Sequence, residues 1–139
     1  MKALLTVLHW IFGGIFVFAG ITKVADPQSF LASIRGFRLL PDPFAASAAL
    51  GLPWLEIFCG AAVMAGVFRR AGLLLLNVCL VSFIIALLVA KIRGLDVTCG
   101  CFGSTFKTSV RVELAIDFVL LAVGAGLLRH AVRSSRDAA

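Results

Sequence analysis

Long apolar stretches, separated by short polar or proline-containing segments, dominate the pattern along this chain. Three of them, at residues 3–24, 45–68 and 71–90, approach the ~20 apolar residues that an α-helix needs to cross a bilayer. A fourth stretch, at 112–128, is shorter and predicts a fourth span. The pattern therefore predicts an all-α integral membrane protein, a four-helix bundle that forms one domain over residues 1–139.

The segment from Ser29 to Arg38, between the first two spans, has a different pattern. Its large apolar residues, Phe30, Ile34 and Phe37, recur at helical spacing and alternate with polar positions. This spacing predicts a short amphipathic helix that lies at the membrane interface.

Composition supports the membrane class. Hydrophobic residues make up 61% of the chain and charged residues 14%, and the mean hydropathy is +1.07. A soluble domain has roughly 25% charged residues. The net charge of +6 is explained by anchoring to an anionic lipid surface, so the bilayer is the expected partner and no nucleic acid is required.

The basic residues also predict an orientation. Four spans place both termini on the same side as Arg69 and Arg70, which we expect to form a minimal hairpin between the second and third spans. Two adjacent arginines in a tight turn are a strong cytoplasmic retention signal. We therefore expect a multi-pass protein of the cytoplasmic (inner) membrane, with cytoplasmic termini and the loop at 91–111 on the outer side.

Two cysteines one residue apart stand in that outer loop. Cys99 and Cys101 flank Gly100, the residue best able to adopt the backbone angles of the very small ring that a disulfide would close. A strained, exposed disulfide is readily reduced, which is typical of a carrier of oxidising equivalents. Disulfides also persist outside the cytoplasm. Cys99 and Cys101 are therefore the predicted catalytic residues of a thiol-disulfide oxidoreductase.

Polar residues inside the spans form a second candidate group. Lys23, Glu56 and Asp117 fall at similar depth below the outer loop, and buried charges are costly unless they pair. We expect Lys23 to pair with Glu56 or Asp117; the alternative is a structural ion pair that only fixes helix register. Cys59 and Cys79, also at matching depths, are a candidate second thiol pair. We favour the interpretation that Cys59 and Cys79 only pack in a helix interface, since cysteine is a small apolar residue that packs well there.

Three motifs in the chain match those of a known family. They are the run from Gly14 to Lys23 with Asp26-Pro27 and Phe30, then Leu52-Pro53-Trp54-Leu55-Glu56 with Gly60, and Cys99-Gly100-Cys101-Phe102-Gly103. Over nearly its whole length the chain resembles the DoxX-like membrane proteins, and most of all their MauE branch.

This resemblance implies a four-helix membrane protein of thiol redox metabolism, with a thioredoxin-like soluble partner outside the cytoplasm. By position, it carries over to Lys23, Glu56, Cys99 and Cys101. Family members often have an arginine before the acidic or amide position of the fourth span. Here Asp117 follows an isoleucine, so the resemblance does not extend to Asp117.

Three functions remain open at this point. The first and favoured one is thiol-disulfide exchange, with a quinone near Lys23 and Glu56 as the candidate electron carrier. The second is a metal-handling protein, because two neighbouring thiolates suit Cu(I). The third is a small-solute transporter in which Glu56 and Lys23 couple transport. A tetrahedral zinc site is not predicted, since the outer loop has only two plausible ligands.

A thioredoxin-like partner needs a docking surface as well as the two cysteines. We expect it on the outer loops at 26–44 and 91–111, with the apolar anchors Phe37, Leu39, Phe102 and Phe106.

Overall fold

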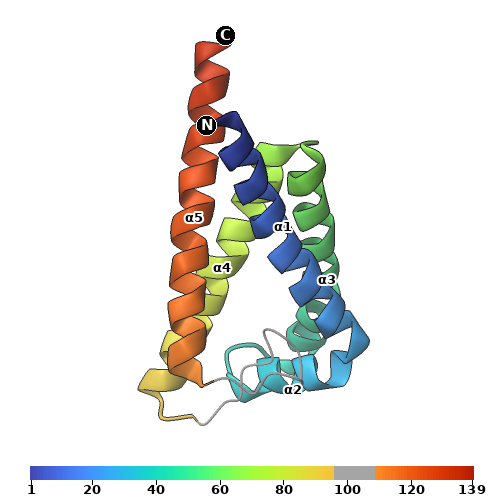
Figure 1. Cartoon of the computed structure of the whole chain (residues 1–139). Helices are drawn as coiled ribbons and strands as arrows, with labels where there is room; N and C mark the ends of the chain where they lie inside the picture. The colour runs from blue at the N-terminus through green and yellow to red at the C-terminus, as the bar shows by residue number, and fades with distance from the viewer. Residues whose placement is uncertain (96–108) are drawn as a thin grey trace.

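The structure is a computed structural model of the chain and describes residues 1–95 and 109–139. This described part contains five α-helices and no strand (Figure 1). The helices are α1 (Lys2–Ala25), α2 (Pro27–Gly36), α3 (Asp42–Ala65), α4 (Arg69–Ile92) and α5 (Val110–Asp137). The prediction of an all-α fold is thereby confirmed for these residues.

Three of these helices, α1, α3 and α4, are long and apolar enough to cross a membrane, and each has 24 residues. At 1.5 Å per residue, such a helix is ~36 Å long, against a hydrocarbon core of ~30 Å. Large apolar side chains on their outer faces, among them Trp10, Phe18 and Phe58, are more than half exposed, as contact with lipid requires. These features are those of a membrane protein.

The fourth long helix, α5, differs in composition. By length and hydropathy, only α1, α3 and α4 are apolar enough to span a membrane among the helices of the described residues. Helix α5 has 28 residues, seven of them charged, and it continues nine residues beyond the predicted end at 128. Both chain termini lie at the same end of the molecule, and α2 lies at the opposite end (Figure 1).

Close backbone contact joins α1 to α3. A Cβ atom added to Gly13 would lie 2.6 Å from the carbonyl oxygen of Gly60, and one added to Gly60 would lie 2.6 Å from that of Gly13. Helix pairs in membranes use small residues in this way to bring their backbones together. On the other side of the bundle α4 packs along α5, and α3 joins the two pairs by packing on α4.

The predicted amphipathic helix is present as α2, two residues earlier than expected. Asp26 caps it by accepting a hydrogen bond from the backbone N–H of Ser29, and Pro27 occupies the first turn. The apolar residues here turn towards the bundle: Phe30 of α2 packs near the start of α3, and Phe37, directly after α2, packs against α4. Because Phe37 is buried, the expectation that it anchors a partner was wrong.

The turn between α3 and α4 also lies earlier than predicted. Helix α3 ends at Ala65 because Gly66 adopts a left-handed conformation with φ of 79°, and Phe68 follows with φ of 49°. Arg69 and Arg70 are therefore not the hairpin itself, as we expected, but the first two residues of α4.

Candidate functional site

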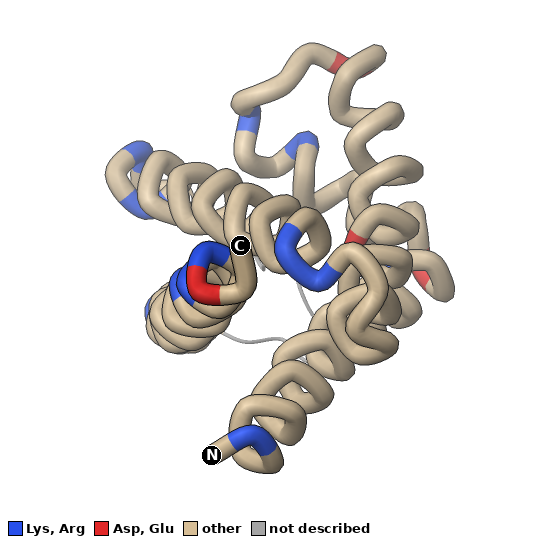
Figure 2. The backbone as a smooth tube through the Cα atoms, turned by 90° about the horizontal axis from the view of Figure 1, so that it is seen from above, with Lys and Arg blue, Asp and Glu red and all other residues tan. Residues whose placement is uncertain are grey.

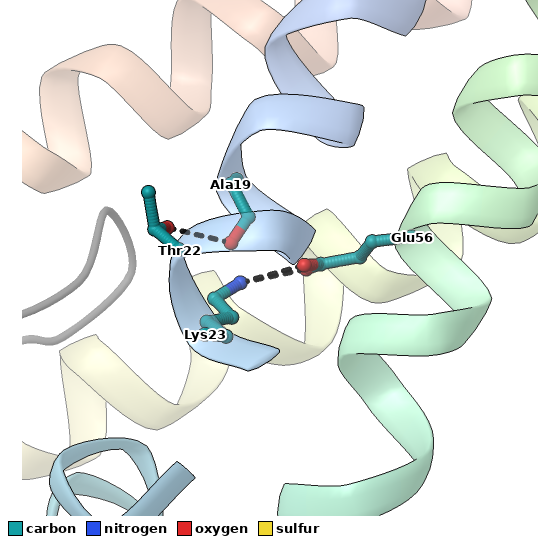
Figure 3. Close-up of polar contacts among 4 residues, drawn as sticks. All are labelled: Ala19, Thr22, Lys23 and Glu56. Carbon is teal, nitrogen blue, oxygen red and sulfur yellow. Dashed lines mark hydrogen bonds and ion pairs between the residues drawn. The ribbon is translucent and has the colours of Figure 1, made fainter. Parts of the chain in front are cut away.

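Lys23 and Glu56 form a buried ion pair between α1 and α3 (Figure 3). The Nζ atom of Lys23 lies 2.8 Å from both Oε1 and Oε2 of Glu56. The two residues are only 2% and 1% exposed. Of the two partners considered for Lys23, Glu56 is the one that holds its ammonium group, by charge-assisted hydrogen bonds that are stronger than neutral ones.

Helix packing one turn away brings this pair together. A Cβ atom on Gly20 would lie 2.7 Å from the carbonyl oxygen of Pro53. Gly20 precedes Lys23 by three residues and Pro53 precedes Glu56 by three, so each contact residue shares a helix face with its charged neighbour. The close approach of the two backbones thus places the ammonium and carboxylate groups within reach of each other.

Two aromatic rings complete the surroundings of Lys23. Its Nζ atom lies 5.1 Å from the centre of the Phe30 ring on α2 and 4.9 Å from that of Phe83 on α4. Both distances are within the range of cation–π attraction. Thr22, next to Lys23, takes no part in the pair, since its hydroxyl donates to the carbonyl oxygen of Ala19 at 2.8 Å (Figure 3).

Asp117 on α5 borders the same site. It is 6% exposed and lines a cavity of about 30 Å³ together with Lys23 and Glu56. Its Oδ2 atom has no hydrogen-bond partner among the described residues. A cavity of this volume has room for one or two water molecules, and these three charged side chains are its polar lining. The structure therefore gathers the three predicted polar residues around one cavity, two of them as an ion pair.

Cys59 and Cys79 are both buried, with free thiols. Cys59 belongs to the core, and its carbonyl oxygen lies against Gly72 of α4, where an added Cβ would be 3.1 Å away. Cys79 borders an apolar pocket of about 390 Å³ between α2, α3 and α4, which Phe83 also lines. The redox pairing of Cys59 with Cys79 stays a prediction. Cys99 and Cys101 lie outside the described residues.

Asn77 is among the buried polar residues that the sequence analysis did not single out. Asn77 lies in the middle of α4, where its Nδ2 atom donates to the carbonyl oxygen of Leu73 at 2.7 Å. It faces Gly124 of α5, whose added Cβ would lie 2.7 Å from the Asn77 Oδ1 atom. The sequence feature that could have identified Asn77 is a single amide side chain within an otherwise apolar run. Within residues 1–95 and 109–139, no group of three His, Cys, Asp or Glu residues is placed to hold a metal ion.

Long apolar helices around a buried ion pair define a helical membrane protein. The chain belongs to the MauE family: the family model described as "Methylamine utilisation protein MauE" matches residues 1–130. The resemblance to the MauE branch is thereby confirmed, whereas the wider DoxX-like relationship stays a prediction.

Curated relatives agree with this assignment. The methylamine utilization protein MauE of Paracoccus versutus is 30% identical over 134 residues, which cover 91% of this chain and 72% of that protein. For MauE of Methylorubrum extorquens the identity is 31% over 110 residues, 78% of this chain and 56% of the relative. For MauE of Paracoccus denitrificans the identity is 28% over 119 residues, which cover 81% of this chain and 64% of the relative. The chain thus spans about half to three quarters of the length of these relatives. No solved structure matches it.

Proposed function

We propose that this protein is a membrane thiol-disulfide redox protein that exchanges disulfide equivalents through Cys99 and Cys101 with a thioredoxin-like soluble domain. The observation that carries the proposal is the Cys99-Gly100-Cys101 motif in the connection between α4 and α5. The description of its family as methylamine utilisation proteins supports a part for this protein in methylamine utilisation, which belongs to the same proposal.

The proposed topology has four spans. The apolar part of α5, at 112–128, crosses the membrane beside α1, α3 and α4 and completes a four-helix bundle. Both termini lie at one end of the molecule together with Arg69 and Arg70 at the start of α4, and this basic end faces the cytoplasm (Figure 1). The connection that bears the two cysteines then lies outside, where disulfides persist.

The exchange itself balances without another reactant. A thiolate of the partner attacks one sulfur of the Cys99–Cys101 disulfide, a mixed disulfide forms, and the other cysteine leaves as a thiolate. The second thiolate of the partner then attacks the mixed disulfide. The partner leaves with a disulfide, and Cys99 and Cys101 remain reduced with the two electrons. The same steps in reverse reduce the partner.

The pocket beside Cys79 fits a quinone as the membrane electron carrier. Its volume of about 390 Å³ lies in the range of small-molecule sites, ~300–1,000 Å³, and Phe37 and Phe83 give it aromatic walls. A bound quinone would accept the two electrons and two protons of the reduced cysteine pair. Phe83 connects this pocket with the ion pair, because its ring also lies over the ammonium group of Lys23.

In this proposal Lys23, Glu56 and Asp117 are positioning residues. They join four of the helices: Lys23 on α1 binds Glu56 on α3 and lies over Phe83 on α4, and Asp117 on α5 closes the same cavity. Phe83 and Asp117 lie about two turns from the ends of α4 and α5 that carry the cysteine connection, and in this proposal the cluster orients those ends.

Thiol counting tests the proposal. The purified protein is denatured and alkylated with and without prior reduction, and the alkylated thiols are counted by mass spectrometry. We expect two additional thiols after reduction in the wild type and none in Cys99→Ser. Cys59→Ser and Cys79→Ser are the matched controls and keep the difference of two. A wild-type count that reduction does not change refutes the proposal.

The alternatives predict other outcomes. A Cu(I)-handling protein would keep Cys99 and Cys101 as reduced thiolates that bind the metal. A small-solute transporter would typically use interrupted helices near its coupling site, whereas α1 and α3 run unbroken through Lys23 and Glu56.

A further inference from the structure

A basic pocket lies at the end of the molecule opposite the Lys23–Glu56 pair. The first turns of α1, the start of α4 and the last turns of α5 surround it, and its volume is about 660 Å³. Its basic and imidazole side chains are Lys2, His9, Arg69, Arg70 and His130. None of its described lining residues is acidic. Figure 2 views the molecule from this end and shows Lys or Arg beside the N-terminus, where α1 begins, and near the C-terminus.

The start of α4 adds further positive potential. Its first turn consists of Arg69, Arg70 and Ala71, all three of which line the pocket. The first N–H groups of an α-helix have no partner within the helix and carry the positive end of its dipole. The first turn of α4 contains no acidic residue, and its N-cap residue, Phe68, makes no side-chain capping bond. Such a helix start is suited to an anion.

A buried, unpartnered imidazole gives independent support. His9 is 4% exposed and lines the pocket. Its Nδ1 atom lies 2.6 Å from the carbonyl oxygen of Leu5, which can only accept, so Nδ1 carries the proton. The other ring nitrogen, Nε2, has no hydrogen-bond partner among the described residues, and neither has Nε of Arg69. Buried polar atoms without partners cost free energy, so a polar group that reached them would stabilise the protein.

We infer that this pocket binds a phosphate group, supplied either by the head group of an anionic phospholipid or by free phosphate. The guanidinium groups of Arg69 and Arg70 bind phosphate oxygens in a bidentate manner, and Lys2 adds a point charge. The neutral His9 ring accepts a hydrogen bond at Nε2 from a hydroxyl of the ligand. Basic pockets at the ends of membrane helices are typical sites for anionic head groups. This site is separate from the thiol chemistry proposed above.

Thermal unfolding in a neutral detergent and a phosphate-free buffer tests the inference. In one arm, inorganic phosphate is titrated against chloride at equal ionic strength, which cancels general screening. In the other arm, phosphatidylglycerol is added to the micelles and compared with phosphatidylcholine. We expect at least one phosphate source to raise the midpoint of unfolding by about 5 °C or more near saturation. A rise with the lipid alone identifies a head-group site, and a rise with inorganic phosphate identifies a free-phosphate site.

Variants distinguish the pocket from general surface charge. Arg70→Gln and Lys2→Gln each remove a charge that lines the pocket, and both should lose most of the shift. Arg133→Gln is the control: Arg133 is exposed and lies in the last turns of α5, near the pocket, but it does not line the pocket. This variant should keep the shift in the unfolding midpoint. Arg69→Gln is less suited, because the Arg69 guanidinium also packs against Gly66 and its loss could disturb the turn. No shift in the wild type, or an equal loss in Arg133→Gln, overturns the inference.

Discussion

The ring of Phe83 lies between a polar and an apolar space: its centre is 4.9 Å from the Nζ atom of Lys23, and it also lines the pocket that Cys79 borders. A ring face towards a desolvated ammonium group stabilises by about 0.5–2 kcal/mol. Phe83 thus links the ion pair between α1 and α3 to the pocket proposed for an electron carrier.

Replacement of Phe83 should therefore act through Lys23. We expect Phe83→Leu to lower the free energy of unfolding in the wild type by about 0.5–2 kcal/mol more than in a Lys23→Met background, because only the wild type loses the cation–π contact. The measurement is chemical unfolding of the four proteins in one detergent. Equal losses in both backgrounds would show that Phe83 contributes packing alone.

Separation of the ion pair should cost more than removal of the whole pair. Lys23→Met strands the carboxylate of Glu56, which is 1% exposed, and we expect a loss of about 3–5 kcal/mol of unfolding free energy. Lys23→Met combined with Glu56→Gln leaves no buried charge in the pair and should recover part of this loss. The same unfolding measurement on the single and double variants completes a double-mutant cycle. Strictly additive losses would mean that the two side chains do not interact.

The matching level of Lys23 and Glu56 could be predicted from the sequence, but the levels of Cys59 and Cys79 could not. The fixed rise of 1.5 Å per residue puts Lys23 and Glu56 at one level, and the structure joins them. The same argument puts Cys59 and Cys79 at one level. In the structure, however, the carbonyl oxygen of Cys59 lies against Gly72, which precedes Cys79 by seven residues, or about 10 Å along α4. The level argument depended on a hairpin at Arg69 and Arg70, and the chain turns earlier.

Local backbone conformation was also beyond the sequence pattern. The hairpin was expected at Arg69 and Arg70 because charged residues interrupt two apolar runs. The chain turns instead at Gly66, which takes the left-handed conformation at the end of α3. The arginines are thereby free to start α4 and line the basic pocket, and the hydropathy pattern gave no indication of that pocket.

The contact between α1 and α3 provides a test with a matched control on the same helix. Gly13→Ala places a Cβ 2.6 Å from the Gly60 carbonyl oxygen, which belongs to the backbone and cannot move aside, and we expect a loss of about 1–3 kcal/mol. At the adjacent Gly14 no atom lies within 4 Å of an added Cβ. Gly14→Ala should be neutral or stabilising by up to about 1 kcal/mol, since alanine favours the helix. If thermal unfolding shows equal effects for both, the close approach of the helices is not as described.

Covalent trapping of the partner is the sharpest test of the thiol chemistry. Exchange proceeds through a mixed disulfide, and removal of the resolving cysteine prevents its breakdown. Of Cys99→Ser and Cys101→Ser, one variant should therefore accumulate an adduct with a soluble thioredoxin-like protein. The adduct should appear on non-reducing gels of membranes and disappear with reductant. The buried Cys59 and Cys79 provide controls, because their serine variants should trap nothing.

The docking surface can be tested in the trapping variant. Phe37 is buried, whereas Leu39 and Leu40 between α2 and α3 are more than two fifths exposed, so they are the available apolar anchors in the described residues of that loop. Leu39→Asp should reduce the adduct several-fold, because a charge at an apolar contact opposes docking. Arg133→Gln is the control, because this exposed residue lies at the opposite end of the molecule, and it should leave the yield of the adduct unchanged. An exposed apolar residue such as Phe58 is less suited as a control, because Phe58→Asp would insert a charge into the proposed lipid face. If neither cysteine variant forms an adduct while both lose Cu(I) binding, metal handling becomes the better account of Cys99 and Cys101.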